Sequence, residues 1–275
     1  MTISTLKKLP NVQGVGASQT FTIGMPTGAK EYKTVGLDMS GTTFVKTDIS
    51  NLELLVNSSP VQQFKTVAHL EAISAYYGLD VNANEVVLPF FLEWMNDALM
   101  GGKFNMGVGD VDVFQLRGDI GSGAVAPLIN AWSIETQRAA MDGQGIAAAN
   151  RLGVFRRVVN QTVSLVGAGE TEIDNIPRND ILMALHMIQS SDVITNVEVW
   201  CDDTKVWDAS ASRAERVVER VGRTKQSDCY HIDFMLENEL GTALVIAGLR
   251  DFRLKVAHSG SATVVLYREL MSGNV

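Results

Sequence analysis

The chain has 275 residues, of which 46% are hydrophobic and 20% charged, and its formal net charge is −8 at pH 7. These proportions predict a folded globular protein with a substantial core and exclude a disordered chain. The acidic balance argues against a protein that grips phosphate backbones, because that role needs a concentrated basic face. The one local basic pair, Arg156 and Arg157, is expected to be solvated or to contact another subunit.

The amino-terminal stretch MTISTLKKLPNV lacks the apolar run of a signal peptide, and no stretch reaches the 18 consecutive apolar residues of a membrane span. We therefore expect the chain to be made and kept in the cytosol. The two cysteines, Cys201 and Cys229, lack CxxC spacing. Reduced, partly buried thiols are expected rather than a disulfide framework or a zinc site.

The first half of the chain predicts strands and one helix. Runs with β character begin at Thr20, at Asn51 and near Val86. Thr66 can cap a helix that Gly78 ends. One side of this helix is apolar: Val67, Leu70, Ile73 and Tyr77.

The second half repeats this order. Short β-rich runs occur at 162–166, 181–188, 196–201 and 262–270. In YHIDFMLE, apolar residues alternate with His231 and Asp233, the period of a strand with one buried face. Ser212 and Glu215 predict a capping box for a helix that Gly222 ends. The apolar stripe of this helix is Ala214, Val217, Val218 and Val221.

Matching segments occur in one order in both halves. VFQLRGDIGSGAVAPLI (113–129) aligns without a gap with DFRLKVAHSGSATVVLY (251–267), 138 positions later. LPFFLE matches IDFMLE at an offset of 144, NLELLV matches NVEVWC at 145, and TFTI matches TVSL at 142. The two helix-ending glycines are also 144 apart. These matches predict tandem duplication of a whole domain.

The predicted fold class is therefore all-β: tandem, or double, jelly-roll β-sandwiches of about eight strands, each with one inserted α-helix. The Ala- and Gly-rich stretch that follows Glu135 has no counterpart elsewhere in the chain. Residues 1–135 are predicted to form the first jelly roll with an amino-terminal arm, 136–153 a linker, and 154–275 the second jelly roll.

Motifs that suggest enzyme chemistry fail on inspection. VSLVGAGETEID places Gly167 and Gly169 after a strand, but Glu172 occupies the third glycine position and IDNIP replaces the helix that would hold a pyrophosphate. No phosphate-binding loop and no GxSxG motif are present. Cys229 and His231 would share one face of a strand, a pairing more often incidental than catalytic. We predict no enzyme activity, no catalytic residues and no cofactor-binding residues.

Metal binding has little support in the sequence. The four histidines, His69, His186, His231 and His258, include no HxH pair, so solvated or packed side chains are expected. Two acidic pairs could supply oxygen ligands for calcium: Asp110/Asp112 and Asp202/Asp203. Neither matches DxDxDG, and CDDTKVW is typical of a tight hairpin. No metal ligand can be assigned.

Four segments of the second half resemble the corticovirus-type major capsid protein, within the double jelly-roll capsid lineage of membrane-containing tailless icosahedral phages. These segments are GETEIDNIPR (169–178), VEVWCDDTKVWD (197–208), YHIDFMLE (230–237) and LRDFRLKV (249–256). LPNV (9–12) and the strand after it also resemble that family, whereas residues 40–150 match much less well.

The resemblance implies a major capsid protein of the virion that is assembled in the host cytoplasm. Homotrimers would form pseudo-hexameric capsomers and tile an icosahedral shell around an internal membrane. The implied partners are neighbouring capsomers, a penton or vertex protein and the viral inner membrane, without direct nucleic-acid binding. The resemblance also implies possible calcium binding and no required cofactor.

Two other functions stay open from the sequence. The first is a cytosolic tandem β-sandwich, bicupin-like or carbohydrate-binding, which would need clustered histidines or an aromatic platform. The four tryptophans are scattered two to a copy: Trp94, Trp132, Trp200 and Trp207. The second is a minor vertex protein of the same type of virus.

Overall fold

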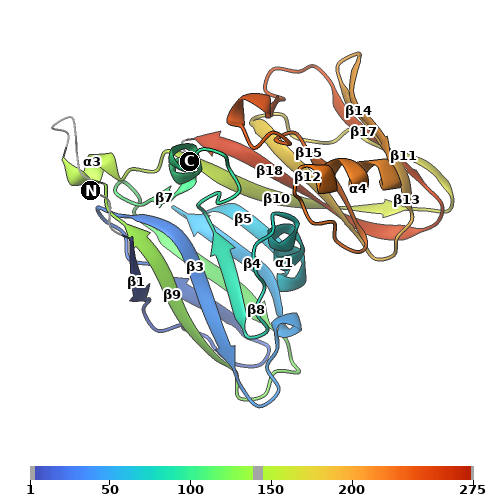
Figure 1. Cartoon of the computed structure of the whole chain (residues 1–275). Helices are drawn as coiled ribbons and strands as arrows, with labels where there is room; N and C mark the ends of the chain where they lie inside the picture. The colour runs from blue at the N-terminus through green and yellow to red at the C-terminus, as the bar shows by residue number, and fades with distance from the viewer. Residues whose placement is uncertain (1–3, 139–144, 274–275) are drawn as a thin grey trace. The chain divides into compact units, whose positions relative to one another are not determined.

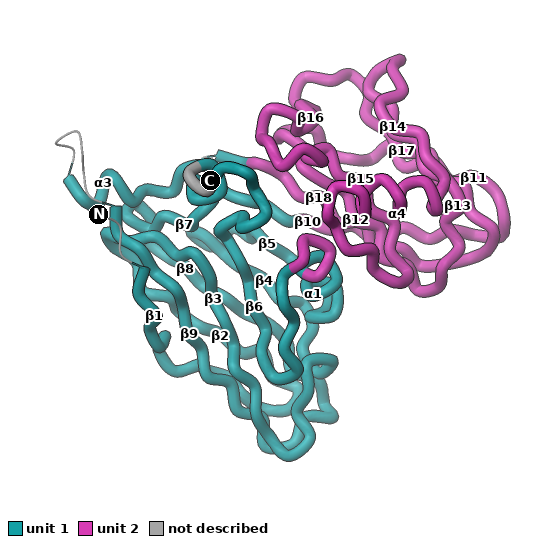
Figure 2. The backbone as a smooth tube through the Cα atoms, in the orientation of Figure 1, with its two compact units in different colours: residues 1–74, 79–158, 272–275 teal, residues 75–78, 159–271 magenta. Residues whose placement is uncertain are grey.

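A computed structural model describes residues 4–138 and 145–273. The chain divides into two compact units (Figure 2). The first unit takes in residues up to 74, 79–158 and from 272 on, and the second takes in 75–78 and 159–271. The predicted linker at 136–153 falls partly outside the described residues.

Two antiparallel sheets build the first unit (Figure 1). One sheet has the order β1 (Ser4–Lys8), β9 (Leu128–Thr136), β3 (Glu31–Ser40) and β6 (Glu85–Pro89), and β7 (Met106–Gly107) also pairs with β3. The other has the order β2 (Thr20–Gly24), β8 (Phe114–Ile120), β4 (Ile49–Val56) and β5 (Ser59–Thr66). Helix α1 (Val67–Tyr76) follows β5 and precedes β6.

The second unit has the same plan. One sheet has the order β10 (Val154–Leu165), β18 (Ala262–Gly273), β12 (Ile181–Gln189) and β15 (Cys229–Asp233), with β16 (Leu244–Val245) paired to β12. The other has the order β11 (Gly169–Ile173), β17 (Phe252–His258), β13 (Ile194–Cys201) and β14 (Thr204–Ser210). Helix α4 (Ala211–Arg220) follows β14 and precedes β15.

Each strand of the first unit, and helix α1, therefore has a counterpart at the same place in the second. The eight long strands of each unit have the jelly-roll order, and the described residues add one two-residue strand per unit, β7 and β16. Short helical turns make up the rest: η1 (Lys46–Asp48), α2 (Ala98–Gly101), η2 (Gly102–Phe104), α3 (Ile146–Ala149) and η3 (Leu240–Thr242). The predicted fold class is confirmed. None of the described helices is long and apolar enough to cross a membrane.

Irregularities of the sheets recur at matching positions. The pairing of β3 with β9 shifts between Tyr32 and Thr34, and that of β12 with β18 shifts between Leu182 and Ala184. The β4–β5 pairing shifts at Leu54–Leu55 and the β13–β14 pairing at Val199–Trp200, 145 positions later. A bulge bends a strand at one specific place, so two matching bulges are independent support for the duplication.

Two of the sequence matches are wrong in register. TFTI forms β2, whereas TVSL lies in β10, which is the counterpart of β1 rather than of β2. The ungapped match also fails beyond the strands that begin at Phe114 and Phe252. The turn at 121–127 is longer than the turn at 259–261, so Ile129 corresponds to Val264, opposite Met39 and Gln189 respectively. The proposed matches of Ala124 with Ala262 and of Leu128 with Leu266 are therefore wrong.

The helix boundaries were predicted better than one of their caps. Thr66 Oγ1 accepts the His69 N–H at 3.3 Å, as expected, and Gly78 and Gly222 end their helices with φ of +78° and +84°. The predicted capping box at Ser212 is wrong, because α4 begins at Ala211 and its N-cap residue is Ser210.

Alternating apolar residues fill the space between the two sheets of each unit. The largest fully buried side chains of the first unit include Phe21, Tyr32, Phe64 and Phe114, and the ring centroids of Tyr32 and Phe114 are 5.2 Å apart. The core of the second unit includes Leu185, Met187, Ile232, Phe252 and Leu254. These side chains leave the opposite face of the β12–β15 pair to other residues, which form the cluster considered next.

Candidate functional site

The glycine-rich stretch at Gly167 and Gly169 forms a turn between two strands. β10 ends at Leu165 and β11 begins at Gly169, so a strand stands where a dinucleotide site would need a helix. His258 is packed at this turn: its Nδ1 lies 2.9 Å from the Gly167 carbonyl, and its Nε2 lies 3.0 Å from Thr171 Oγ1. The turn therefore leads into a strand, and no helix N-terminus lies there to hold a pyrophosphate.

Cys229 and His231 do not form a catalytic pair. Burial, followed by the nearby Asp228 carboxylate, raises the pKa of the Cys229 thiol to about 12, so the thiol is protonated at neutral pH. His231 uses its Nδ1 toward another imidazole instead. Both cysteines are free, with Cys201 buried and Cys229 half-buried, as expected.

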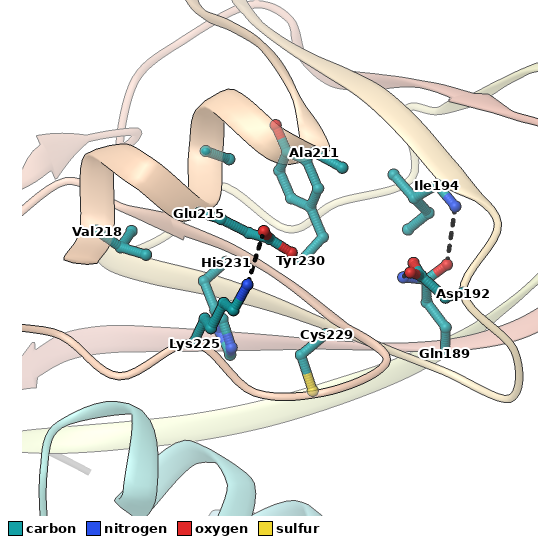
Figure 3. Close-up of a pocket in the computed structure, with 11 residues that line it drawn as sticks. Gln189, Asp192, Ile194, Ala211, Glu215, Val218, Lys225, Cys229, Tyr230 and His231 are labelled. Carbon is teal, nitrogen blue, oxygen red and sulfur yellow. Dashed lines mark hydrogen bonds and ion pairs between the residues drawn. The ribbon is translucent and has the colours of Figure 1, made fainter.

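A narrow crevice of about 20 Å³ lies beside Cys229 (Figure 3). α4 contributes Ala214, Glu215 and Val218 to its lining, and Lys225 bridges to Glu215 at 3.2 Å. This volume holds about one water molecule, so the crevice cannot take an organic ligand.

The acidic pairs considered for calcium serve as turn acceptors. Asp110 Oδ1 accepts the Leu152 N–H at 2.8 Å. Asp202, with φ of +50°, occupies the predicted β13–β14 turn, and its Oδ1 accepts the N–H groups of Arg250 and Asp251. Among the described residues, no group of three or more His, Cys, Asp or Glu side chains could hold a metal ion.

Arg156 does not match its predicted environment. The basic pair was expected to be solvated or to lie at a subunit contact, but only 4% of Arg156 is exposed within the single chain, and Arg157 is half-buried. Phe155 and Arg156 are both buried although they point to opposite faces of β10, and the Arg156 backbone carbonyl accepts a hydrogen bond from Gln62 Nε2 at 3.1 Å. The sequence pattern missed this because the long strand begins at Val154, well before the predicted run at 162–166.

The most unusual arrangement is a cluster of buried polar side chains in the second unit. His186 on β12 lies directly opposite His231 on β15, and Glu269 is on the neighbouring strand β18. Tyr76 and Tyr77, at the end of α1, belong to the same unit. All five side chains are buried, and Asp233 and Arg223 continue the group. We call these seven residues the polar cluster.

Direct contacts join the two imidazoles to their neighbours. The Nδ1 atoms of His186 and His231 are 2.7 Å apart. Tyr76 stacks on His231 with ring centroids 4.2 Å apart. Tyr77 donates its hydroxyl hydrogen to Glu269 Oε2 at 3.0 Å. Glu269 Oε1 is 3.3 Å from His186 Nε2, within ion-pair range but not aligned for a hydrogen bond.

An ion pair closes the other end of the polar cluster. Arg223 Nε lies 3.0 Å from Asp233 Oδ2, and both side chains are at most 3% exposed. Tyr76 donates to the same carboxylate oxygen at 3.2 Å, and the Met235 N–H is bound by Oδ1 at 2.7 Å. The Arg223 guanidinium also lies 4.9 Å from the ring centroid of Tyr77, a cation–π distance.

Burial dominates the protonation of this cluster. It raises the pKa of Tyr76, an effect that the Asp233 charge reinforces. It lowers the pKa of His231 well below the ordinary value, and the adjacent His186 lowers it further. The phenol and this imidazole are therefore held neutral.

The first unit lacks this cluster. The residues at the places of His186, His231 and Glu269 are Gly36, Val87 and Ile134. Trp132 is paired with Gly36 instead, and its ring covers that glycine so closely that an added Cβ would lie 2.1 Å from the indole. The two copies have thus diverged most in chemistry on this face of the sheet.

A charged hollow of about 530 Å³ marks the first unit. Lys7 and Lys30 lie 3.0 and 3.1 Å from the two oxygens of the buried Glu135. Burial raises the pKa of Glu135, but the hydrogen bonds from Lys7 and Lys30 outweigh burial, so the pKa is lowered. Both lysine ammonium groups are already paired with the Glu135 carboxylate, so these charges are used within the chain to stabilise the fold.

Cations and a tryptophan cover the outer face of the β11–β17–β13–β14 sheet. Lys205, Arg253 and Lys255 lie 5.4, 5.7 and 5.9 Å from the Trp200 ring centroid. Trp200 Nε1 donates to Glu198 at 2.8 Å.

Sequence reasoning placed His231 and Asp233 on the strand face opposite the apolar core, and that assignment is confirmed. The strand was predicted to have one buried face and its histidine to be solvated or packed; the second face is buried too, because Tyr76 and Tyr77 cover it from a distant part of the chain. The alternation of residues reveals a face but not what covers it. Only the structure reveals that every residue of β15 from Tyr230 to Asp233 is buried.

Comparison with known proteins agrees with the repeated fold. The family described as viral coat protein P2 matches in both its domains, the N-terminal domain over residues 6–137 and the C-terminal domain over 155–274. The major capsid protein P2 of Pseudoalteromonas phage PM2 is 24% identical over 261 residues, which cover 91% of this chain and 89% of that protein.

Solved structures show the same architecture. The crystal structure of the major capsid protein P2 from bacteriophage PM2 superposes with a TM-score of 0.88 at 20% identity, covering 99% of this chain and 98% of that one. The STIV major capsid protein gives a TM-score of 0.70 at 12% identity, with 98% of each chain covered. The PBCV-1 virus capsid gives 0.68 at 9% identity, covering 98% of this chain and 94% of that one.

Two jelly rolls of one topology define the double jelly-roll class of folds, which the compared capsid proteins share. Within that class the chain belongs to the viral coat protein P2 family and is a major capsid protein of the corticovirus type, a structural component of virions and not an enzyme. The family match includes residues 40–137, most of the stretch in which the sequence resemblance was weakest. This assignment replaces the bicupin-like, carbohydrate-binding and minor vertex alternatives.

Proposed function

We propose that the protein forms homotrimers that act as pseudo-hexameric capsomers and tile an icosahedral shell around an internal membrane. The observation that carries the proposal is the repeat: both units have the same strand order and the same inserted helix. Three chains with two similar units each present six similar sides, as a hexagonal tile requires. Contacts between unlike copies then take the place of a true sixfold axis.

Exposed apolar side chains are available for such contacts. They include Leu6, Val45, Val125, Leu128, Val166 and Val206. Interfaces of obligate oligomers bury on the order of 2,000 Å² or more and are more apolar than the remaining surface. We expect some of these side chains to be covered in the capsomer, together with the charged face around Trp200.

The other partners follow from the same proposal. Neighbouring capsomers, a penton or vertex protein and the viral inner membrane are the expected contacts, and assembly is expected in the host cytoplasm. The net charge of −8 supports a coat that does not bind nucleic acid directly, because phosphate binding needs a basic face.

The domain boundaries, the cofactor requirement and calcium binding are proposed as the sequence predicts them. We propose residues 1–135 as the first jelly roll with its arm, 136–153 as the linker and 154–275 as the second jelly roll. No cofactor is expected to be required. Calcium binding is a weaker proposal that no ligand set carries, and isothermal titration of the capsomer with CaCl₂ would detect it.

Light scattering after size exclusion tests the trimer. The expected mass is three times the chain mass of 29.8 kDa. A stable monomer across the micromolar range would contradict the proposal. As a matched pair, Leu128→Asp should weaken association if that exposed side chain is covered, whereas Glu215→Asp, on a solvated pair with Lys225, should not.

A further inference from the structure

The contact between the two buried imidazoles restricts how many protons they can carry. His186 and His231 face each other across paired strands with Nδ1 atoms 2.7 Å apart. At that distance one nitrogen must donate a hydrogen and the other must accept it with a lone pair. At least one of the two rings is therefore neutral whenever this contact is intact.

Neither ring has room to move to a better partner. His186 is fully buried and His231 is 4% exposed. Tyr76 stacks on His231 and meets His186 edge-on, with ring centroids 5.3 Å apart, while Tyr77 lies 6.1 Å from His186. Nε2 of His231 has no hydrogen-bond partner among the described residues, so a proton added there would be a buried cation without a protein acceptor.

One carboxylate lies within ion-pair range of the two imidazoles. From β18, Glu269 Oε1 lies 3.3 Å from His186 Nε2. From β15, Asp233 is already bound by Arg223, which follows α4, and by the Tyr76 hydroxyl of α1. The Tyr77 hydroxyl donates to Glu269, and Tyr267 of β18, the strand partner of His186, is fully buried. A second imidazolium would lie against the first with no carboxylate of its own.

We propose that His186 and His231 form an acid-sensitive lock of the second unit, which holds β12 to β15 with at most one added proton and opens when both rings become cationic. The lock has no counterpart in the first unit, where Gly36 and Val87 occupy these places. Acid would therefore loosen one jelly roll of the chain before the other.

The direction of the pH dependence follows from linkage. Burial and the adjacent ring lower the pKa of His231 in the folded chain, whereas an exposed histidine has a pKa of about 6.5. Below about pH 6.5 the open state binds a proton that the closed state does not bind. The equilibrium constant for opening should then rise by up to about tenfold for each pH unit of acidification and for each such proton.

Hydrogen exchange on the full-length capsomer tests the lock. We expect amide protection in β12 and β15, corrected for intrinsic exchange, to fall up to about tenfold between pH 6.5 and 5.5, while β3 and β6 change little. The variant His186→Asn/His231→Asn should be less protected at pH 7.5 but should lose this extra pH dependence. His258→Asn, which removes a buried histidine held by a carbonyl and a hydroxyl, should retain it.

Two results would overturn the proposal. The first is an equal pH dependence in the wild type and in the double variant. The second needs no variant: NMR of the histidine-labelled wild type would show both imidazoles of the pair taking up protons between pH 7.5 and 5.5 while β12 and β15 stay protected. If the double variant does not fold, the NMR titration alone decides, because the lock allows at most one of the two rings to become charged in the closed state.

Discussion

The Arg223–Asp233 pair is the clearest case of a buried charge whose partner is indispensable. Both side chains are almost completely inaccessible, and the carboxylate is also bound by Tyr76 and by a backbone N–H. Desolvating two such charges is costly, and their mutual contact offsets the cost only while both are present. Removing one leaves the other buried without its counter-charge.

Arg223→Met should therefore lower the free energy of unfolding by about 3–5 kcal/mol. Lys225→Met, two residues further on, removes an exposed pair with Glu215 and should change it by about 0–1 kcal/mol. Urea titration monitored by circular dichroism compares the two variants. Equal decreases in the free energy of unfolding for the two variants would mean that the buried ion pair contributes no more to stability than the exposed one.

At this scale the sequence predicted faces rather than neighbours. His231 and Asp233 were assigned correctly to the face opposite the core because alternation along one strand fixes the side of each residue. Their burial could not be predicted, since Tyr76 is 157 positions from Asp233 along the chain. Burial of Arg156 was missed for a related reason, because the run of β10 preceding Thr162 was not assigned as a strand.

Among the elements, the ends of α1 and α4 show what a local signal can specify. Gly78 and Gly222 both adopt the left-handed conformation, and an added Cβ would meet no atom within 4 Å at either position. The requirement for glycine is thus a property of the backbone alone, which is why the sequence revealed both stops. The Ser212 cap failed because two nearby serines could serve and only the chain path selects Ser210.

Gly78→Ala and Gly222→Ala should each destabilise by about 1–2 kcal/mol, because alanine is strained at positive φ. Gly24→Ala in β2 is the matched control, since its φ is not in the left-handed region and its Cβ would also be in open space. Thermal unfolding of the three variants gives the comparison. A control loss as large as that of the helix-end variants would show that the effect is not conformational.

For the whole molecule, the duplication could be predicted because strands that begin at Phe114 and Phe252 retain similar residues at a fixed offset. Which residues belong to each compact unit could not be predicted. Residues 75–78 belong to the second unit although they lie in the first half of the chain, and residues from 272 on belong to the first. Sequence periodicity describes each strand separately and carries no information about such exchanged segments.

This exchange predicts that the second jelly roll is incomplete when it is cut out at the proposed boundary. A fragment of residues 154–275 lacks Tyr76 and Tyr77, so the imidazole of His231 and the carboxylates of Asp233 and Glu269 lose the rings and hydroxyls that bind them. We expect β12 and β15 to exchange amide hydrogens faster in the fragment than in the full chain.

Tyr76→Ala/Tyr77→Ala in the full chain should reproduce this faster exchange. Tyr230→Phe removes a hydroxyl bound to the Ala209 carbonyl on the core side and should have a smaller effect. Equal protection in the fragment and the full chain would mean that residues 154–275 contain all that the second fold requires.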